Sequence, residues 1–286
     1  MSTARGVALL RAIEMTRAEN ERVCSDPYAR RFVNPLTVAA TRLMIASGLA
    51  NALGLEAAMT FAMAREQYIH DLIVREARAG LDQLVVLGAG FDTRAYRIAE
   101  LGALGVFEVD HPLTQAAKRE ALRGVVEPTP NVTFVAVDFD TDDLGDRLAS
   151  AGYDVAGRTL FVWQGVTMYL TPEGIDRTLA FIAGHSGAGS VVVFDYFHAE
   201  TLAGSEAAAI RFATWAMGEH LTFGIGETEV EPFLQRRGFS EVHNVDAAAL
   251  KRLHLKGRNA GRPIERGAAI VSARVSEQGH RPASPQ

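Results

Sequence analysis

From Leu81 onward, short apolar runs alternate with longer segments of helical character. Such continuously apolar runs are typical of strands buried on both faces of a parallel sheet, since a half-exposed strand would alternate polar and apolar residues. The connections, for example Pro112–Arg123 and Pro172–Ala183, are long enough for crossover helices. Five such units predict a doubly wound α/β sheet, in which ligands bind beyond the carboxyl ends of the strands. The expected strands are Gln83–Leu87, Val106–Val109, Val132–Val137, Thr159–Val162 and Ser190–Phe194.

The first 80 residues lack this alternation and are expected to form a helical N-terminal cap. Leu36–Leu53 is rich in alanine and apolar on most sides, which predicts a helix covered by other elements. Glu56–Ala79 is expected to be a longer helix, because Phe61 and Leu72 belong to a pattern near the helical period and Gly80 supplies a stop.

The alternation breaks again after the fifth strand. Helices are expected at Thr201–Glu219 and Glu227–Arg237. An insertion at about residues 198–231 is expected to cover the ligand site. Phe239–Val245 and Ala268–Val275 are expected to be two final strands. The expected domains are therefore a cap at residues 1–80, a ligand-binding domain at 81–275 and a disordered tail at 276–286.

Charge and cysteine content exclude several classes of protein. The 29 basic and 34 acidic residues give a net charge of −5, whereas nucleic-acid-binding proteins usually carry a basic surplus, so no nucleic-acid partner is expected. A single cysteine, Cys24, excludes an internal disulfide framework and a cysteine-based zinc site, and the scattered histidines lack zinc-site spacing. No apolar run reaches the roughly 20 residues of a membrane span, and the N-terminus lacks a signal-peptide pattern. We expect a cytoplasmic protein without a metal site or a membrane partner.

A glycine-containing turn follows the first expected strand, in the stretch Gly88-Ala-Gly-Phe-Asp-Thr-Arg94. Glycine lets the backbone approach a ligand closely, and a helix N-terminus favours polar or anionic groups. The same residues also fit a tight strand-to-helix turn without a ligand, with Asp92 or Thr93 as the helix cap. The turn alone therefore leaves both interpretations open.

Acidic residues at the ends of the second and third strands favour a nucleoside ligand. Asp110 follows the glycines by about 20 residues, where a carboxylate can bind a ribose diol. Thr93 takes the place of the third glycine of the dinucleotide fingerprint, which favours S-adenosylmethionine over a cofactor with a pyrophosphate. Asp138 and Phe139 can bind adenine; a solvated turn with Asp138 as a helix cap is the structural alternative.

Four stretches carry a family resemblance: Gly88-Ala-Gly-Phe-Asp-Thr-Arg94, Glu108-Val-Asp-His-Pro112, Asp138-Phe139 and Trp163-Gln-Gly-Val-Thr-Met-Tyr-Leu170. Together they resemble the leucine carboxyl methyltransferase family, and more closely its bacterial branch of S-adenosylmethionine-dependent methyltransferases. The similarity runs from about Arg11 to Val275. It implies a class I methyltransferase fold: a Rossmann-like, doubly wound, mostly parallel sheet whose last strand is antiparallel, with a helical N-terminal cap and a helical lid after the fifth strand.

The resemblance also implies cofactor-binding roles for individual residues. Gly88 and Gly90 lie against the cofactor, with Gly88 at its methionine part. Asp110 binds the ribose hydroxyls, and Asp138 and Phe139 hold the adenine. The cofactor is S-adenosylmethionine, and S-adenosylhomocysteine is the product.

Two further positions concern the amino-acid end of this cofactor. Arg65 matches a family arginine that reaches the cofactor carboxylate, and a guanidinium can bind both of its oxygens. Gln164 departs from the family, which usually has glutamate there, near the cofactor's amino group. Its amide oxygen still accepts a hydrogen bond but carries no charge, so we expect binding to be kept and to be weaker by about 1 kcal/mol. On this interpretation, Gln164→Glu tightens the cofactor.

The implied activity is O-methylation of a carboxyl or hydroxyl group on a small, hydrophobic metabolite of the kind modified in natural-product tailoring. Tyr169 and His198 are the candidate catalytic residues, which would position the acceptor or act as its base; a core tyrosine and a surface histidine are the structural alternatives. His111 is expected to be a helix cap, or a residue that supports the site without touching the ligand, rather than catalytic. A nicotinamide-dependent oxidoreductase and, because of Gln164, a cofactor-binding protein without turnover are the competing functions.

Overall fold

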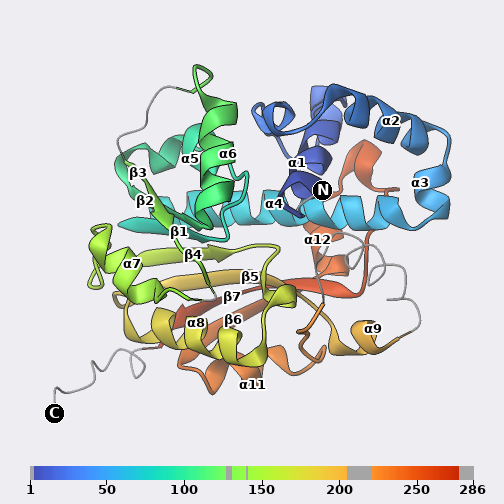
Figure 1. Cartoon of the computed structure of the whole chain (residues 1–286). Helices are drawn as coiled ribbons and strands as arrows, with labels where there is room; N and C mark the ends of the chain where they lie inside the picture. The colour runs from blue at the N-terminus through green and yellow to red at the C-terminus, as the bar shows by residue number, and fades with distance from the viewer. Residues whose placement is uncertain (1–2, 127–130, 140, 205–220, 277–286) are drawn as a thin grey trace, which may run out of the picture.

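A seven-stranded sheet forms the centre of the molecule in this computed structural model, which describes residues 3–126, 131–139, 141–204 and 221–276. The strand order is β3-β2-β1-β4-β5-β7-β6 (Figure 1). Strands β1 to β5 run parallel, and β7 is antiparallel to both of its neighbours, β5 and β6. The predicted fold class, including the antiparallel last strand, is confirmed. The strands are β1 (Gln83–Leu87), β2 (Gly105–Asp110), β3 (Val132–Ala136), β4 (Thr159–Trp163), β5 (Val191–Phe197), β6 (Phe239–Asp246) and β7 (Ala268–Val275).

Helices cover both faces of this sheet. Those of the described residues are α1 (Thr3–Glu14), α2 (Pro35–Ala46), α3 (Leu49–Ala52), α4 (Leu55–Arg78), α5 (Arg94–Arg97), α6 (Pro112–Leu122), α7 (Leu144–Ser150), α8 (Pro172–Gly184), α9 (Ala199–Ala203), α11 (Val230–Gln235) and α12 (Ala247–His254). Figure 1 shows α1 and α4 on one side of the sheet and α8 and α11 on the other.

The apolar strands supply two cores because successive side chains point to opposite faces. In β1, Val85 and Leu87 belong to the core beneath α8, whereas Leu84 and Val86 belong to the core beneath α4. All residues of β1 and β4 are buried, as the continuously apolar runs predicted. Burial on both faces leaves the carboxyl ends of the strands as the place where a ligand can reach this sheet.

The crossover helices begin where proline and a capping side chain coincide. His111 Nδ1 accepts a hydrogen bond from the backbone N–H of Leu113, 3.2 Å away, directly before α6. The hydroxyl of Thr171 accepts one from Gly174 at the start of α8. Proline suits the first helical position because its missing N–H would have no partner there. His111 is therefore a helix cap, as predicted.

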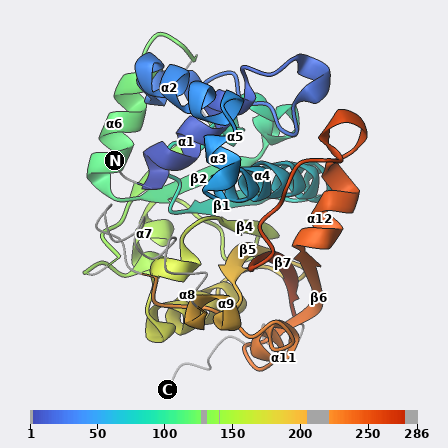
Figure 2. The ribbon, with the colours of Figure 1, turned by 90° about the vertical axis from the view of Figure 1, so that its right-hand side faces the viewer.

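The N-terminal helices form a layer above the sheet, with α2 outside α1 (Figure 2). The expected long helix is present as α4, and Gly80, with φ of +87°, follows its end. The expectation that Leu36–Leu53 is covered by other elements is wrong, because no residue of α2 is buried. Its inner side, including Val38 and Ile45, is only half-buried, and no described element covers its outer side. Apolar composition indicates a helix that needs a neighbour but does not show that the same chain supplies one.

The C-terminal part is described incompletely. Of the helix expected at Thr201–Glu219, α9 occupies the beginning, and residues 205–220 lie outside the described part, as does the expected tail after Ser276. The helix expected at Glu227–Arg237 is the shorter α11. Within the described residues, no helix combines the length and apolar character needed to cross a membrane. The proposed division into domains stays a prediction.

Candidate functional site

A pocket of about 290 Å³ opens at the carboxyl ends of β1, β2 and β4. The sheet provides its floor, and Ala4 and Val7 of α1 line its opposite wall. Six of the residues predicted to bind the cofactor or the acceptor line this one pocket, although they come from α4, two strand ends and the loop after β4. These are Arg65, Gly88, Gly90, Asp110, Gln164 and Tyr169.

The glycine turn has a backbone shape that depends on glycine. Gly88 and Gly90 have φ of +66° and +51°, in the left-handed region that side chains disfavour. A Cβ on Gly88 would lie 2.6 Å from Cγ2 of Val166, so the loop after β4 approaches the turn too closely for any side chain. Asp92 Oδ1 accepts a hydrogen bond from the backbone N–H of Arg94, 2.7 Å away, and Thr93 makes no capping bond. The turn is therefore both a pocket wall and a capped helix start.

Asp110 ends β2 and joins this turn to the next loop. Its Oδ2 accepts a hydrogen bond from the backbone N–H of Gly90 at 2.5 Å, and its Oδ1 accepts one from His111 at 2.6 Å. The half-exposed carboxylate still lines the pocket and has lone pairs for a diol. The other acid of this strand, Glu108, is buried in an ion pair with Lys118 at 2.5 Å and does not line the pocket.

Arg65 places a buried guanidinium on the other side of the pocket. It forms an ion pair with Asp195, whose Oδ1 also accepts a hydrogen bond from the backbone N–H of Gly165 at 2.6 Å. The Nε of Arg65 has no hydrogen-bond partner among the described residues. The arginine is therefore held by one carboxylate and keeps an N–H donor without a partner.

Gln164 belongs to a charged network that the sequence did not predict. Its Oε1 accepts a hydrogen bond from Arg94 Nη2 at 2.5 Å, and its Nε2 donates one to Glu66 Oε2 at 3.1 Å. Glu66 also accepts hydrogen bonds from Arg94 at 2.6 Å and Arg97 at 2.5 Å. We call Glu66, Arg94, Arg97 and Gln164 the Glu66 network. It ties α4, the helix after the glycine turn and the loop after β4 together around the pocket.

The electrostatics of this network keep Glu66 ionised. Burial alone would raise the pKa of this carboxyl group, but the guanidinium groups of Arg94, Arg97 and Arg11 hold the pKa well below its usual range. Arg11 reaches the same region from α1, donating to the carbonyl oxygen of Phe91 at 2.8 Å. Arg94 was part of a noted motif, whereas no sequence signal singled out Glu66 or Arg11.

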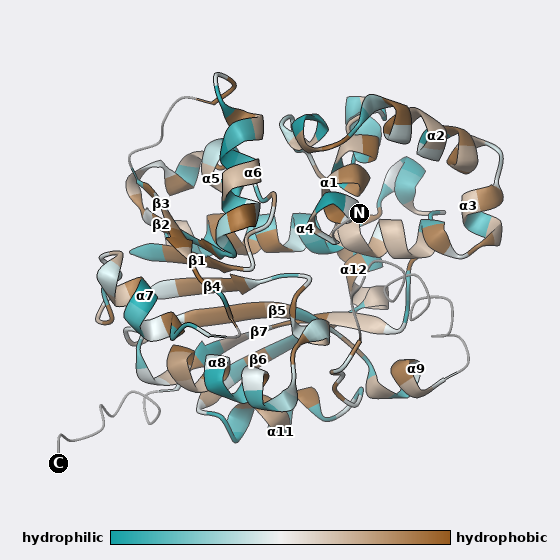
Figure 3. Ribbon diagram, viewed as in Figure 1, coloured by the Kyte–Doolittle hydropathy of each residue, from teal (hydrophilic) through white to brown (hydrophobic). Residues whose placement is uncertain are grey.

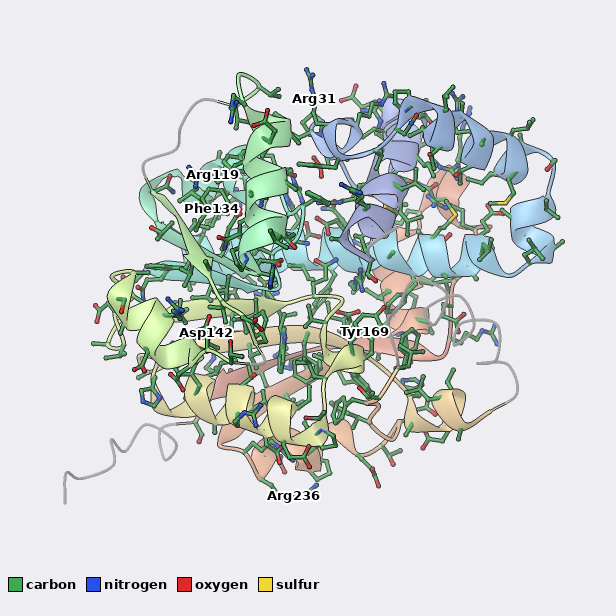
Figure 4. The ribbon with its side chains drawn as sticks, in the orientation of Figure 1. Arg31, Arg119, Phe134, Asp142, Tyr169 and Arg236 are labelled. Carbon is green, nitrogen blue, oxygen red and sulfur yellow. The ribbon has the colours of Figure 1, made fainter. Side chains whose placement is uncertain are left out.

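Asp138 and Phe139 are not part of this pocket. Phe139 lines a neighbouring cavity of about 240 Å³, and Tyr169 lines both cavities. Figure 4 labels Tyr169 and also Asp142, whose Oδ2 accepts a hydrogen bond from the backbone N–H of Asp138 at 2.9 Å. Asp138 is not the cap of α7, because Asp143 occupies that position. The structure thus places the expected adenine residues beside the pocket rather than within it.

His198 does not reach the pocket. Strand β5 continues to Phe197, which carries His198 to the start of α9, where its side chain is buried beside Tyr196. The alternative of a surface histidine is therefore wrong. Among the described residues, no group of three or more His, Cys, Asp or Glu could hold a metal ion.

Comparisons with known proteins agree with this site. The family model described as leucine carboxyl methyltransferase matches residues 4–183. A relative in Mycobacterium avium (strain 104) is 36% identical over 198 residues, which are 66% of this chain and 62% of the relative. One in Mycolicibacterium smegmatis (strain ATCC 700084 / mc(2)155) is 33% identical over 221 residues, 75% of this chain and 72% of the relative. Both are named "Putative S-adenosyl-L-methionine-dependent methyltransferase".

The matched regions are not the whole of the relatives. This chain covers 62 to 65% of the length of three of the mycobacterial relatives. A solved structure of an O-methyltransferase family protein from Burkholderia thailandensis aligns with a TM-score of 0.50 and 12% identity, covering 78% of this chain and 60% of that one. This likeness supports the fold alone. From the family match and the mycobacterial relatives, the chain belongs to the leucine carboxyl methyltransferase family.

Proposed function

We propose that the chain is an S-adenosylmethionine-dependent methyltransferase that methylates a carboxyl or hydroxyl oxygen of a small, hydrophobic molecule. The observation that carries this proposal is the meeting of three groups at one pocket: the Gly88–Gly90 turn, the Asp110 carboxylate and the Arg65 guanidinium. These are the groups that a nucleoside with an amino-acid tail requires. Family membership supports the same activity.

The pocket fits this cofactor in size and in chemistry. Its volume of about 290 Å³ lies just below the range for small-molecule sites, about 300–1,000 Å³. Arg65 Nε, which is buried without a partner among the described residues, suits the cofactor carboxylate, and Asp110 suits the ribose hydroxyls. When bound, S-adenosylmethionine supplies an activated methyl group, so the protein's main task is to align the acceptor with it.

The proposed adenine site lies toward the second cavity. Phe139 offers an aromatic face there, and Asp138 is held close by the turn around Asp142. Adenine bound in this cavity would leave the first pocket for the ribose and the amino-acid end. Tyr169, which lines both cavities, would then lie beside the reacting centre.

The proposed acceptor is inferred from the pocket wall and from the family. Ala4 and Val7 present apolar side chains, which suits a hydrophobic acceptor. A carboxylate acceptor is already ionised near neutral pH and needs no base, whereas a hydroxyl acceptor must lose a proton. Tyr169 is the residue that we propose to position the acceptor oxygen. His198 lies away from this pocket and is not proposed as the base.

Calorimetry of the purified protein tests the cofactor proposal. We expect S-adenosylmethionine and S-adenosylhomocysteine to bind and NADH and NADPH not to bind. Asp110→Ala should weaken binding roughly tenfold to a hundredfold, because hydrogen bonds to a charged group contribute about 1.5–3 kcal/mol. Asp71→Asn, an exposed acid on α4, is the control and should bind as the wild type does. Binding of the nicotinamide cofactors alone would overturn the proposal.

A screen with methyl-labelled cofactor tests the acceptor. Candidate carboxylic acids, phenols and alcohols are incubated with the protein, and labelled product is then treated with mild base. A methyl ester releases its label, whereas a methyl ether retains it, so the treatment separates the two proposed acceptor groups. Label that is transferred only to nitrogen, sulfur or carbon atoms would contradict O-methylation.

A further inference from the structure

The outer face of α2, together with α3 and the start of α4, is the most apolar exposed surface of the described residues. Nine large hydrophobic side chains are exposed among the described residues, and five of them fall within residues 36–55. Figure 3 shows brown, hydrophobic segments along α2 and α3. We call this surface the Leu36–Leu55 face. Its leucines are Leu36 (78% exposed), Leu43 (72%), Leu49 (50%), Leu53 (58%) and Leu55 (41%).

This face has the spacing of a helix–helix contact. Leu36, Ala40 and Leu43 are separated by four and three residues, so they form one stripe along α2, and all three are exposed. The small alanine between two leucines allows a neighbouring helix to approach closely. This 12-residue helix has no buried residue, and within the described part of the chain no element packs against the stripe that would stabilise it there.

The charges indicate which kind of partner fits. Arg42 is the one ionisable residue from Pro35 to Leu55, and it lies away from the stripe, in a groove lined by Val38 and Arg30. Two copies of this face can therefore meet without opposing like charges, as a two-fold contact requires. Helices that lie on membranes instead carry many basic residues beside the apolar stripe, and this chain has a net charge of −5. A lipid surface is the poorer match.

The exposed area also fits a dimer. The five leucines together expose the surface of about three whole leucine residues, to which exposed alanines add. The result is a patch of several hundred Å², the size of the largest apolar patch on a typical monomer, about 300–600 Å², which is often an interaction site. A standard interface buries about 800 Å² on each partner, so this face and its rim supply an area of the right order.

We propose that the Leu36–Leu55 face binds a second copy of this chain across a two-fold axis, with α2 packed against α2 of the partner. The contact would buttress α1, which lies between α2 and the pocket (Figure 2). It does not depend on the identity of the methyl acceptor or of the cofactor.

Sedimentation velocity over a concentration series tests this proposal with the full chain. The wild type should sediment as a dimer at micromolar concentration, and Leu36→Glu/Leu43→Glu as a monomer, with a dissociation constant raised at least a hundredfold. Leu113→Glu is the matched control, because this leucine is 76% exposed on α6, outside the face, and the variant should remain a dimer. Circular dichroism shows whether each variant is folded.

A cross-linking variant keeps the test decisive if the double variant does not fold. Leu43→Cys should form a disulfide-linked dimer on mild oxidation, whereas Leu113→Cys should not, and the native Cys24 is buried. A monomeric wild type, a dimer that survives the double substitution, or equal cross-linking of both cysteine variants would each overturn the proposal. Flotation with vesicles rich in phosphatidylglycerol, by a wild type that stays monomeric in solution, would assign the face to lipid instead.

Discussion

Replacing Gln164 by glutamate would bring a second carboxylate against Glu66. The amide nitrogen of Gln164 now lies 3.1 Å from Glu66 Oε2 and donates a hydrogen bond to it. Two unit charges at that distance repel by about 5 kcal/mol at an effective dielectric constant of about 20. Arg94, which contacts both residues, offsets part of this repulsion, and the pair can relieve more by binding a proton. Loss of the hydrogen bond to the charged Glu66 remains, so we expect a net loss of about 2 kcal/mol in the free energy of unfolding.

The reciprocal exchange separates this contact from other effects. Glu66→Gln leaves Arg94 and Arg97 without their shared carboxylate, and breaking a buried ion pair costs about 3–5 kcal/mol. The double variant Glu66→Gln/Gln164→Glu again holds one carboxylate and one amide beside Arg94, which contacts both positions. Its loss of stability should therefore be smaller than the sum of the single losses by about 2 kcal/mol.

Urea unfolding followed by circular dichroism measures all four proteins of this cycle. Gln67→Glu is the control, because Gln67 Nε2 also donates to an acid, Asp71, at 2.7 Å, but in an exposed position. Because solvent screens the two exposed charges, Gln67→Glu should lower the free energy of unfolding by less than about 0.5 kcal/mol. If Gln164→Glu is as stable as this control, or if the single losses simply add, the Glu66 network does not act as described. Calorimetry on the same variants tests the sequence-based expectation that the substitution tightens the cofactor, which took no account of Glu66.

Three further predictions concern single positions. Gly88→Ala should lower the free energy of unfolding, measured in urea, by about 1–3 kcal/mol more than Gly124→Ala does. Both glycines have φ near +67°, but only at Gly88 would a Cβ meet another side chain. Equal losses would contradict the close approach of Val166 to Gly88. The pKa of Glu66 is lower in the folded chain than in the unfolded chain, where it is near 4.5. The ionised Glu66 therefore stabilises the fold at a pH above about 4.5, and this contribution is lost as the pH falls below that value. Glu66→Gln should therefore reduce the fall in the urea midpoint between pH 7 and pH 3. The same fall in the variant and the wild type would refute the role given to Glu66. His198→Ala should leave S-adenosylmethionine binding within twofold of the wild type, since the residue lies outside the pocket; a tenfold loss by calorimetry would show otherwise.

The sequence predicted the sheet well because each strand can be recognised from its own run of residues. Continuously apolar runs bounded by turns set the strands to within a few residues, for example Gln83–Leu87 without error. The glycine turn and Asp110 were found because strand order brings successive strand ends to one edge. Gly88, Gly90 and Asp110 accordingly line one pocket.

The side-chain contacts around that pocket were not predictable in the same way. Glu66 meets Arg94 and Gln164 across separations of 28 and 98 residues, and no periodic pattern encodes such pairs. Local pattern also did not reveal that His198 is buried, because its position depends on how far β5 continues. The prediction that other elements cover α2 was wrong because an apolar helix side indicates that something packs against it, but not whether the same chain does so.

The position of β7 has a consequence for how this chain is made. It is the last strand of the described chain, yet it lies between β5 and β6 and hydrogen-bonds to both. Until residues 268–275 have been added, β5 has an unpaired edge and β6 has no neighbour in the sheet, so the sheet cannot close. Exposed edges of this kind recruit other strands. Products truncated before Ala268 should therefore aggregate rather than survive as smaller folded proteins.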